Sequence, residues 1–244
     1  MGCLGWAGTW FEDAELQNLA MQDLKGLAAF PCYRQYEEPD LSLGHSGRLL
    51  WYVYTHWDWV KDSLGGEIEN AFERIVKDAL PFSREKHGVF ASKADILALD
   101  APYSVVRNIP FIGTVGIALS ANAIGHPAAS ELNERLHALL GAILDLRSGG
   151  LSAGVAYDGY IMDFAIPWLQ SLAEAERRPV LDHPRFGDFL DESVYLSVPG
   201  EMVRVAELGD VEPEEMPFHI SAHAKGYAMR PTARAGWYLQ QCRP

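Results

Sequence analysis

Two tyrosines follow a glycine-rich stretch and have the spacing that a catalytic pair would need. Residues 149–160 read GGLSAGVAYDGY, which places Tyr157 and Tyr160 three residues apart. If a helix begins by Tyr157, both phenols lie on one side of its first turn, where unpaired backbone N–H groups favour an anion such as a carboxylate. The pair therefore predicts proton transfer on an acidic ligand, with Asp158 as a further substrate-binding candidate. The alternative is that both rings only pack the start of the helix.

A second candidate is the aromatic run WYVYTHWDW, which covers residues 51–59 and contains one histidine. At helical spacing Tyr52, His56 and Trp59 share one face. Aromatic rings can stack on sugars, and an imidazole transfers protons near neutral pH. We therefore expect Tyr52 and Trp59 to bind substrate and His56 to act as an accessory base. The alternative is an aromatic seam in the core.

Other motifs predict neither a metal nor a cofactor. His219 and His223 have the spacing of a two-histidine metal helix, but no glutamate lies between them as in HExxH. Gly113 and Gly116 fit neither G-x-x-x-x-G-K-[ST] nor G-x-G-x-x-G, so close helix packing explains them better. The three cysteines are scattered and have no CxxC spacing, which favours a reducing, cytoplasmic location.

Composition and charge exclude several classes of partner. The chain has 244 residues, 48% of them hydrophobic, which is typical of a globular protein with a real core. Lys and Arg number 20 against 33 Asp and Glu, and the net charge of −13 disfavours nucleic acid and anionic membranes. No window reaches the roughly 18 to 20 apolar residues of a membrane span. The first residues lack a basic region and a long apolar stretch, so we expect no secretory signal.

Apolar residues recur at three- and four-residue steps along most of the chain, which predicts helices. The predicted helices cover about residues 13–28, 48–64, 67–80, 110–124, 127–146, 158–175 and 184–194. Gly65-Gly66 and the sequence Gly125-His126-Pro127 are predicted to separate the helices of two hairpins. Residues 110–124 are apolar nearly all round, so other helices should enclose them. Residues 203–206 are the best short candidate for a strand.

These elements predict a mainly α protein. We expect an α/α-toroid-like array of helix hairpins, with about six or seven helices in a single domain over residues 1–244. A helical bundle is the other arrangement that such hairpins allow. Residues 174–215 contain twelve acids and four arginines, and we expect an irregular acidic segment from about residue 198 onward.

Residues 108–210 resemble the toroid region of the heparinase II/III-like and alginate-lyase-like families. The stretch GVAYDGY is similar to the Glu-Gly-x-x-Tyr-x-x-Tyr type of motif that opens an inner helix in these families. The pairs Pro199-Gly200 and Gly209-Asp210 are similar to their later Pro-Gly and Gly-Asp. The resemblance implies an incomplete α/α toroid and cleavage of uronate-containing polysaccharides by β-elimination.

The resemblance also implies roles for individual residues. Tyr157 and Tyr160 match the two tyrosines of the motif, and Asn108 stands where the family often has the asparagine that neutralises the uronate carboxylate. Such neutralisation stabilises the enediolate that develops when the C5 proton leaves. Ala153 stands where the families usually have an acid, and the chain ends too early for their β-sandwich. Any cleft would then either be closed by a second copy, which would make the protein a homo-oligomer, or be left shallow.

The sequence thus predicts a lyase that acts on an acidic oligosaccharide or another small-molecule substrate. One alternative from a different class is a non-catalytic helical module that binds a glycan or a protein along its concave face. Another alternative is a small-molecule cyclase or hydrolase built on an α/α toroid.

Overall fold

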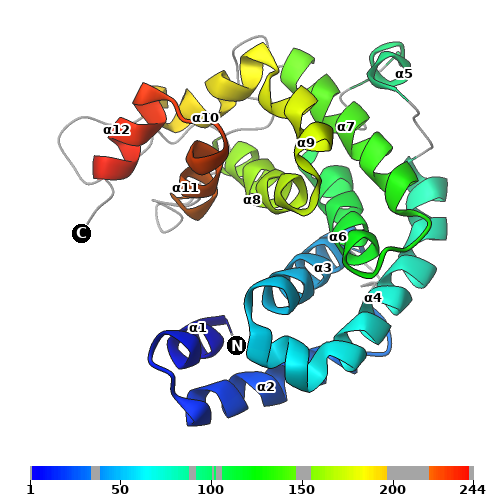
Figure 1. The fold of residues 1–244 in the computed structure, drawn as a ribbon. Helices are drawn as coiled ribbons and strands as arrows, with labels where there is room; N and C mark the ends of the chain where they lie inside the picture. Colours follow the sequence, from blue (N-terminus) through cyan, green and yellow to red (C-terminus); the bar gives the residue numbers. More distant parts are fainter. Residues whose placement is uncertain are drawn as a thin grey trace. The chain divides into compact units, whose positions relative to one another are not determined.

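A computed structural model describes residues 2–33, 39–87, 92–100, 102, 106–146, 155–196 and 220–241. These residues form twelve α-helices and no strand (Figure 1). The prediction of a mainly α protein is therefore confirmed, whereas the prediction of six or seven helices is wrong. The strand candidate at residues 203–206 lies outside the described residues. In the described part of the chain, no helix is long and apolar enough to cross a membrane.

Contacts between residues divide the chain into two compact units. Unit 1 comprises Met1–Gly88 and Ile112–Leu132, and unit 2 comprises Val89–Phe111 and Asn133–Pro244. The helices Asn108–Ile124 and Ala129–Leu146 each have residues in both units. The expectation of a single domain over residues 1–244 stays a prediction.

Unit 1 contains the N-terminal helices and most of the helix that is buried on all sides. Its helices are α1 (Gly2–Trp10), α2 (Ala14–Ala28), α3 (Pro39–His56), α4 (Asp58–His87), most of α6 (Asn108–Ile124) and the first turn of α7 (Ala129–Leu146). Every residue from Pro110 to Ala121 is buried. The predicted enclosure of this segment is therefore confirmed.

Unit 2 is built around an apolar central helix and several short helices. Its complete helices are α5 (Lys93–Leu97), α8 (Val155–Ser171), α9 (Glu174–Leu181), α10 (Pro184–Leu196), α11 (Ile220–Met229) and α12 (Ala233–Gln241). Seven of the nine residues from Ile161 to Leu169 are core hydrophobics that are at most 1% exposed, so α8 supplies much of the core of this unit. Residues 197–219 of the expected acidic segment lie outside the described residues, and α11 and α12 follow them.

Two helices of unit 1 cross with their backbones in contact. A Cβ atom added at Gly47 of α3 would overlap the carbonyl oxygen of Gly116 in α6, and one added at Gly116 would overlap that of Leu43. One helical turn away, a Cβ atom at Gly113 would lie 2.7 Å from an Asp40 oxygen. Only glycine allows backbones to approach this closely. The prediction that Gly113 and Gly116 serve close helix packing is therefore confirmed.

The boundary between α3 and α4 differs from the predicted one. The break falls at Trp57, whose carbonyl oxygen accepts the N–H groups of Val60 at 3.0 Å and Lys61 at 3.2 Å, and α4 then continues through Gly65-Gly66 and Pro81. Each of the two glycines costs a helix only about 1 kcal/mol relative to alanine. The apolar stripe of α4 is buried from Val60 to Ala79. Burial contributes about 1.5–3 kcal/mol for each large side chain, which outweighs the cost of the glycines.

Several other boundaries agree with prediction to within a few residues. Asp13 caps α2, with its carboxylate accepting from the N–H groups of Glu15 and Leu16. Between α6 and α7, Gly125 has a φ of 62°, and the N–H of His126 donates to the carbonyl oxygen of Ala121 at 2.9 Å. This is the backbone conformation that a glycine after a helix end allows. The helices α1, α5, α9, α11 and α12 were not predicted, because they are short or lack a long apolar stripe.

Replacing Gly47 tests the contact between α3 and α6. We expect Gly47→Ala to lower the free energy of unfolding by about 3 kcal/mol or more, because the added methyl meets a backbone atom that can move away only if the helices separate. Urea unfolding followed by circular dichroism measures the effect.

Gly66→Ala is the matched control for this prediction. A Cβ atom at Gly66 would meet nothing within 4 Å, so alanine should raise the stability of α4 by about 0.5–1 kcal/mol. A Gly47→Ala protein as stable as the wild type would contradict the close crossing.

Candidate functional site

The candidate residues divide between the two units. Tyr52, His56 and Trp59 belong to unit 1, whereas Asn108, Tyr157, Asp158 and Tyr160 belong to unit 2.

The two tyrosines lie in the first turns of α8. This helix begins at Val155, so both phenols follow the start of a helix as predicted; residues 149–154 of the glycine-rich stretch lie outside the described residues. Tyr157 and Tyr160 are half-buried, and the ring of Tyr160 lies 6.0 Å from that of Phe164 between centroids. Neither phenol is sealed in the core. Asp158 between them is 1% exposed.

Asn108 also stands at the start of a helix. It is the first residue of α6 and is half-buried, two residues before the fully buried part of that helix begins at Pro110. The first backbone N–H groups of a helix have no partner within the helix, so polar side chains and ligands bind there. Asn108 and the tyrosines thus occupy the N-terminal turns of two apolar helices.

In unit 1, His56 and Tyr52 form a stacked pair at the end of α3. Their ring centroids are 4.5 Å apart with an interplanar angle of 15°, and His56 is exposed. The Nδ1 atom of His56 lies 2.8 Å from the hydroxyl of Thr55 and 3.1 Å from the carbonyl oxygen of Tyr52. Nδ1 is therefore held by groups of its own helix. Nε2 is the ring nitrogen left for the proposed role as a base.

Trp59 does not share a helix with this pair. The break at Trp57 puts Trp59 on α4, so the prediction of one helix face for all three residues is wrong. Its ring stacks on that of Trp57 at 5.2 Å, and its indole N–H donates to the hydroxyl of Thr9 at 3.0 Å. Trp51 and Trp57 are each 5% exposed, so part of the aromatic run is the core seam given as the alternative.

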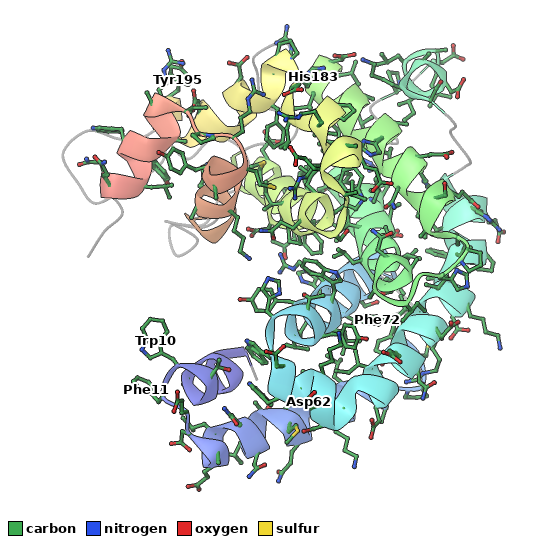
Figure 2. The ribbon with its side chains drawn as sticks, in the orientation of Figure 1. Trp10, Phe11, Asp62, Phe72, His183 and Tyr195 are labelled. Carbon is green, nitrogen blue, oxygen red and sulfur yellow. The ribbon has the colours of Figure 1, made fainter. Side chains whose placement is uncertain are left out.

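A polar network in unit 2 was missed by sequence reasoning. Asp145 at the end of α7 accepts from Nε2 of His183 at 2.9 Å and pairs with the ammonium of Lys93 at 2.5 Å. Burial raises the pKa of Asp145, but the hydrogen bonds and charges of Lys93 and His183 outweigh this and lower it. The network joins α5, α7 and the start of α10. Figure 2 labels its histidine, His183.

His183 is fully engaged in this network. Its Nδ1 accepts the N–H of Arg185 at 3.2 Å, and its carbonyl oxygen accepts from Arg230 at 2.7 Å. His126 makes the equivalent bond to Ala128 at 3.1 Å. In both cases histidine precedes a proline and caps a helix. The His-Pro pair before a helix is the sequence signal that could have revealed these caps, and two occupied ring nitrogens give His183 a structural role.

His137 lies half-buried beside the largest core side chain of unit 2. Its ring meets the edge of Trp168 at 4.9 Å, and the indole N–H of Trp168 donates to Asn133 at 3.0 Å. Burial lowers the pKa of His137, against a smaller opposing effect of Glu176. His137 is therefore neutral at pH 7.

His219 and His223 are the two histidines near the C-terminus that have the spacing of a metal helix. His219 lies outside the described residues, and His223 is 4% exposed with its ring 5.4 Å from that of Tyr238. Among the described side chains, no group of three or more His, Cys, Asp and Glu residues could hold a metal ion.

Comparisons with known proteins identify no relative: the chain matches no family model, no curated protein and no solved structure.

Replacing His137 tests its effect on stability against pH. Because its folded pKa lies below the ordinary value of 6.5, the unfolded chain takes up the proton first as the pH falls. Its contribution is therefore constant above about pH 6.5 and lost as the pH falls toward the folded pKa. We expect the urea midpoint of the wild type to fall more between pH 7.5 and 5.0 than that of His137→Gln. An equal fall in both proteins would contradict a neutral, buried imidazole.

Proposed function

We propose that the protein is a lyase of the α/α-toroid type that cleaves a uronate-containing oligosaccharide by β-elimination. The observation that carries the proposal is the position of Tyr157 and Tyr160, which are half-buried in the first turns of α8 and not enclosed in the core. The resemblance of GVAYDGY to the tyrosine motif of heparinase II/III-like and alginate-lyase-like enzymes supports the same assignment.

The proposed reaction needs a base, an acid and a group that neutralises the carboxylate. One phenol, as phenolate, accepts the C5 proton of the uronate, the C4–O bond breaks, and the leaving oxygen takes a proton from the other phenol. The amide of Asn108 hydrogen-bonds the uronate carboxylate, so that the negative charge developing there is stabilised. The product is a sugar with a double bond between C4 and C5. Asp158 is buried, which favours a role in orienting the first turn over direct contact with the sugar.

The charge of the protein limits the size of the proposed substrate. A net charge of −13 repels a long polyanion, whereas a short oligosaccharide responds mainly to the groups around its binding site. In unit 1, the stack of half-buried Tyr52 and exposed His56 supports binding of a sugar ring, with His56 as an accessory base. From the scattered cysteines we also propose a cytoplasmic location, and a second copy remains our proposal for closing the cleft.

The alternative is a helical module that binds a glycan without cleaving it. It is favoured by Ala153, because the related motif usually has an acid at that position. The experiment below separates the two functions.

Absorbance near 232 nm, where unsaturated uronides absorb, tests the lyase directly. We expect the purified protein to raise this absorbance with at least one of polymannuronate, polyguluronate, polygalacturonate and heparan sulfate oligosaccharides. Tyr157→Phe or Tyr160→Phe should lower the rate by at least about 100-fold, the usual contribution of a proton-transfer group. Asn108→Ala should lower the rate by a similar factor.

Tyr54→Phe is the control for loss of a phenol. Tyr54 donates to Glu69 at 2.5 Å, and this bond raises the pKa of Tyr54 to about 12, so it is unsuited to proton transfer. Its replacement should leave the rate unchanged. Oligosaccharide binding without a rise in absorbance, unaffected by either α8 variant, would refute the lyase and favour the module.

A further inference from the structure

Three exposed side chains lie on α10 and α12 of unit 2, and two of them are in contact. Tyr195 is 63% exposed and Trp237 is 51% exposed, and the guanidinium of Arg234 lies 5.0 Å from the centre of the Tyr195 ring. Trp237 follows Arg234 by three residues on α12, so the two side chains leave the helix on the same side. Figure 2 labels Tyr195 on α10. We call Tyr195, Arg234 and Trp237 the aromatic–arginine cluster.

Buried groups hold the arginine of this cluster in place. Asp191 of α10 is 5% exposed; one carboxylate oxygen accepts from the hydroxyl of Thr232 at 2.7 Å, and the other pairs with Arg234 at 3.4 Å. Thr232 in turn caps α12, because its hydroxyl accepts the N–H of Ala235 at 3.0 Å. The carboxylate of Asp191 thus holds the guanidinium of Arg234, and its bonds to Thr232 and Arg234 connect α10 to α12.

The chemistry of the cluster fits a sugar ring. The flat faces of Tyr195 and Trp237 can cover the C–H faces of a pyranose, and they expose large apolar area that is usually buried against a partner. A guanidinium has five N–H donors, and Arg234 gives only part of them to Asp191, so donors remain for sugar hydroxyls.

The local charge indicates which sugars would bind. The charge of Arg234 is offset by Asp191, and the chain as a whole carries −13, so an anionic ligand gains little here and is repelled at long range. We propose that the aromatic–arginine cluster binds a pyranose ring of a neutral oligosaccharide. This site is additional to the proposed lyase function and needs no covalent step.

Nuclear magnetic resonance tests the site through the indole N–H signal of Trp237, assigned from the spectrum of Trp237→Phe. The probes are cellohexaose, maltohexaose and mannohexaose as neutral ligands, and hexamannuronate as the anionic one. We expect at least one neutral hexaose to shift the Trp237 signal saturably, and to do so at a lower concentration than hexamannuronate.

Variants identify the groups responsible for this binding. Trp237→Ala should weaken the affinity for the neutral hexaose by about tenfold, as expected for loss of an aromatic stacking contact, whereas Trp237→Tyr should stay within about threefold. Arg234→Gln should weaken it by about fivefold or more. Trp10→Ala removes an aromatic side chain of unit 1 that is 69% exposed and should change nothing.

The result does not depend on the lyase. Tyr157→Phe should lower the rate of elimination by at least about 100-fold and leave binding of the neutral hexaose unchanged, so the two proposals can fail separately. Three outcomes would overturn the proposed site: no neutral hexaose shifts the Trp237 signal, Trp237→Ala binds the neutral hexaose as well as the wild type, or hexamannuronate shifts the Trp237 signal at a lower concentration than every neutral ligand.

Discussion

The contact between the backbones of α3 and α6 is the constraint on which the organisation of unit 1 depends. Gly47 and Gly116 have no side chains to hold the helices apart, so backbone atoms of one helix touch those of the other. The face of α6 that carries Gly113 and Gly116 is thereby covered by the backbone of α3.

Unit 2 combines an apolar core with polar contacts between helix ends. The buried face of α8 and the rings around Trp168 supply the hydrophobic free energy. The pairs made by Asp145 and Asp191 add little energy each where they are solvent-exposed, but they determine which helix ends meet. Such contacts suit the short helices of this unit, whose apolar stripes are too small to define a unique packing on their own. The proposed neutral-sugar site lies beside one of these pairs, that of Asp191 and Arg234.

Much of the helical content could be predicted because long apolar stripes at helical spacing occur in few other structures. The ends of α2, α6 and α7 and the packing role of Gly113 and Gly116 followed from local patterns. The helix break predicted at Gly65-Gly66 was wrong. The low helix propensity of two glycines is a small cost beside the burial of the apolar side chains of α4. Short helices such as α5 have too few residues for a periodic pattern to be distinguished from chance.

Candidate sites, like helices, could be predicted where they depend on local sequence and not where they depend on tertiary contacts. The tyrosines at the start of α8 could be placed, since their spacing and the preceding glycines are local features. The pairs His183–Asp145 and Arg234–Asp191 could not, because their members are 38 and 43 residues apart and nothing in the sequence between them encodes the contact. Side chains that meet only through tertiary packing need the structure.

A nuclear Overhauser experiment on the wild-type protein tests the crossing of α3 and α6 most directly. The account predicts a strong cross-peak between the Hα protons of Gly47 and Gly116, because a Cβ atom at Gly47 would lie only 2.8 Å from the Cα atom of Gly116. Cross-peaks from both glycines to side chains of intervening residues, without a peak between the glycines themselves, would show separated helices and contradict the account.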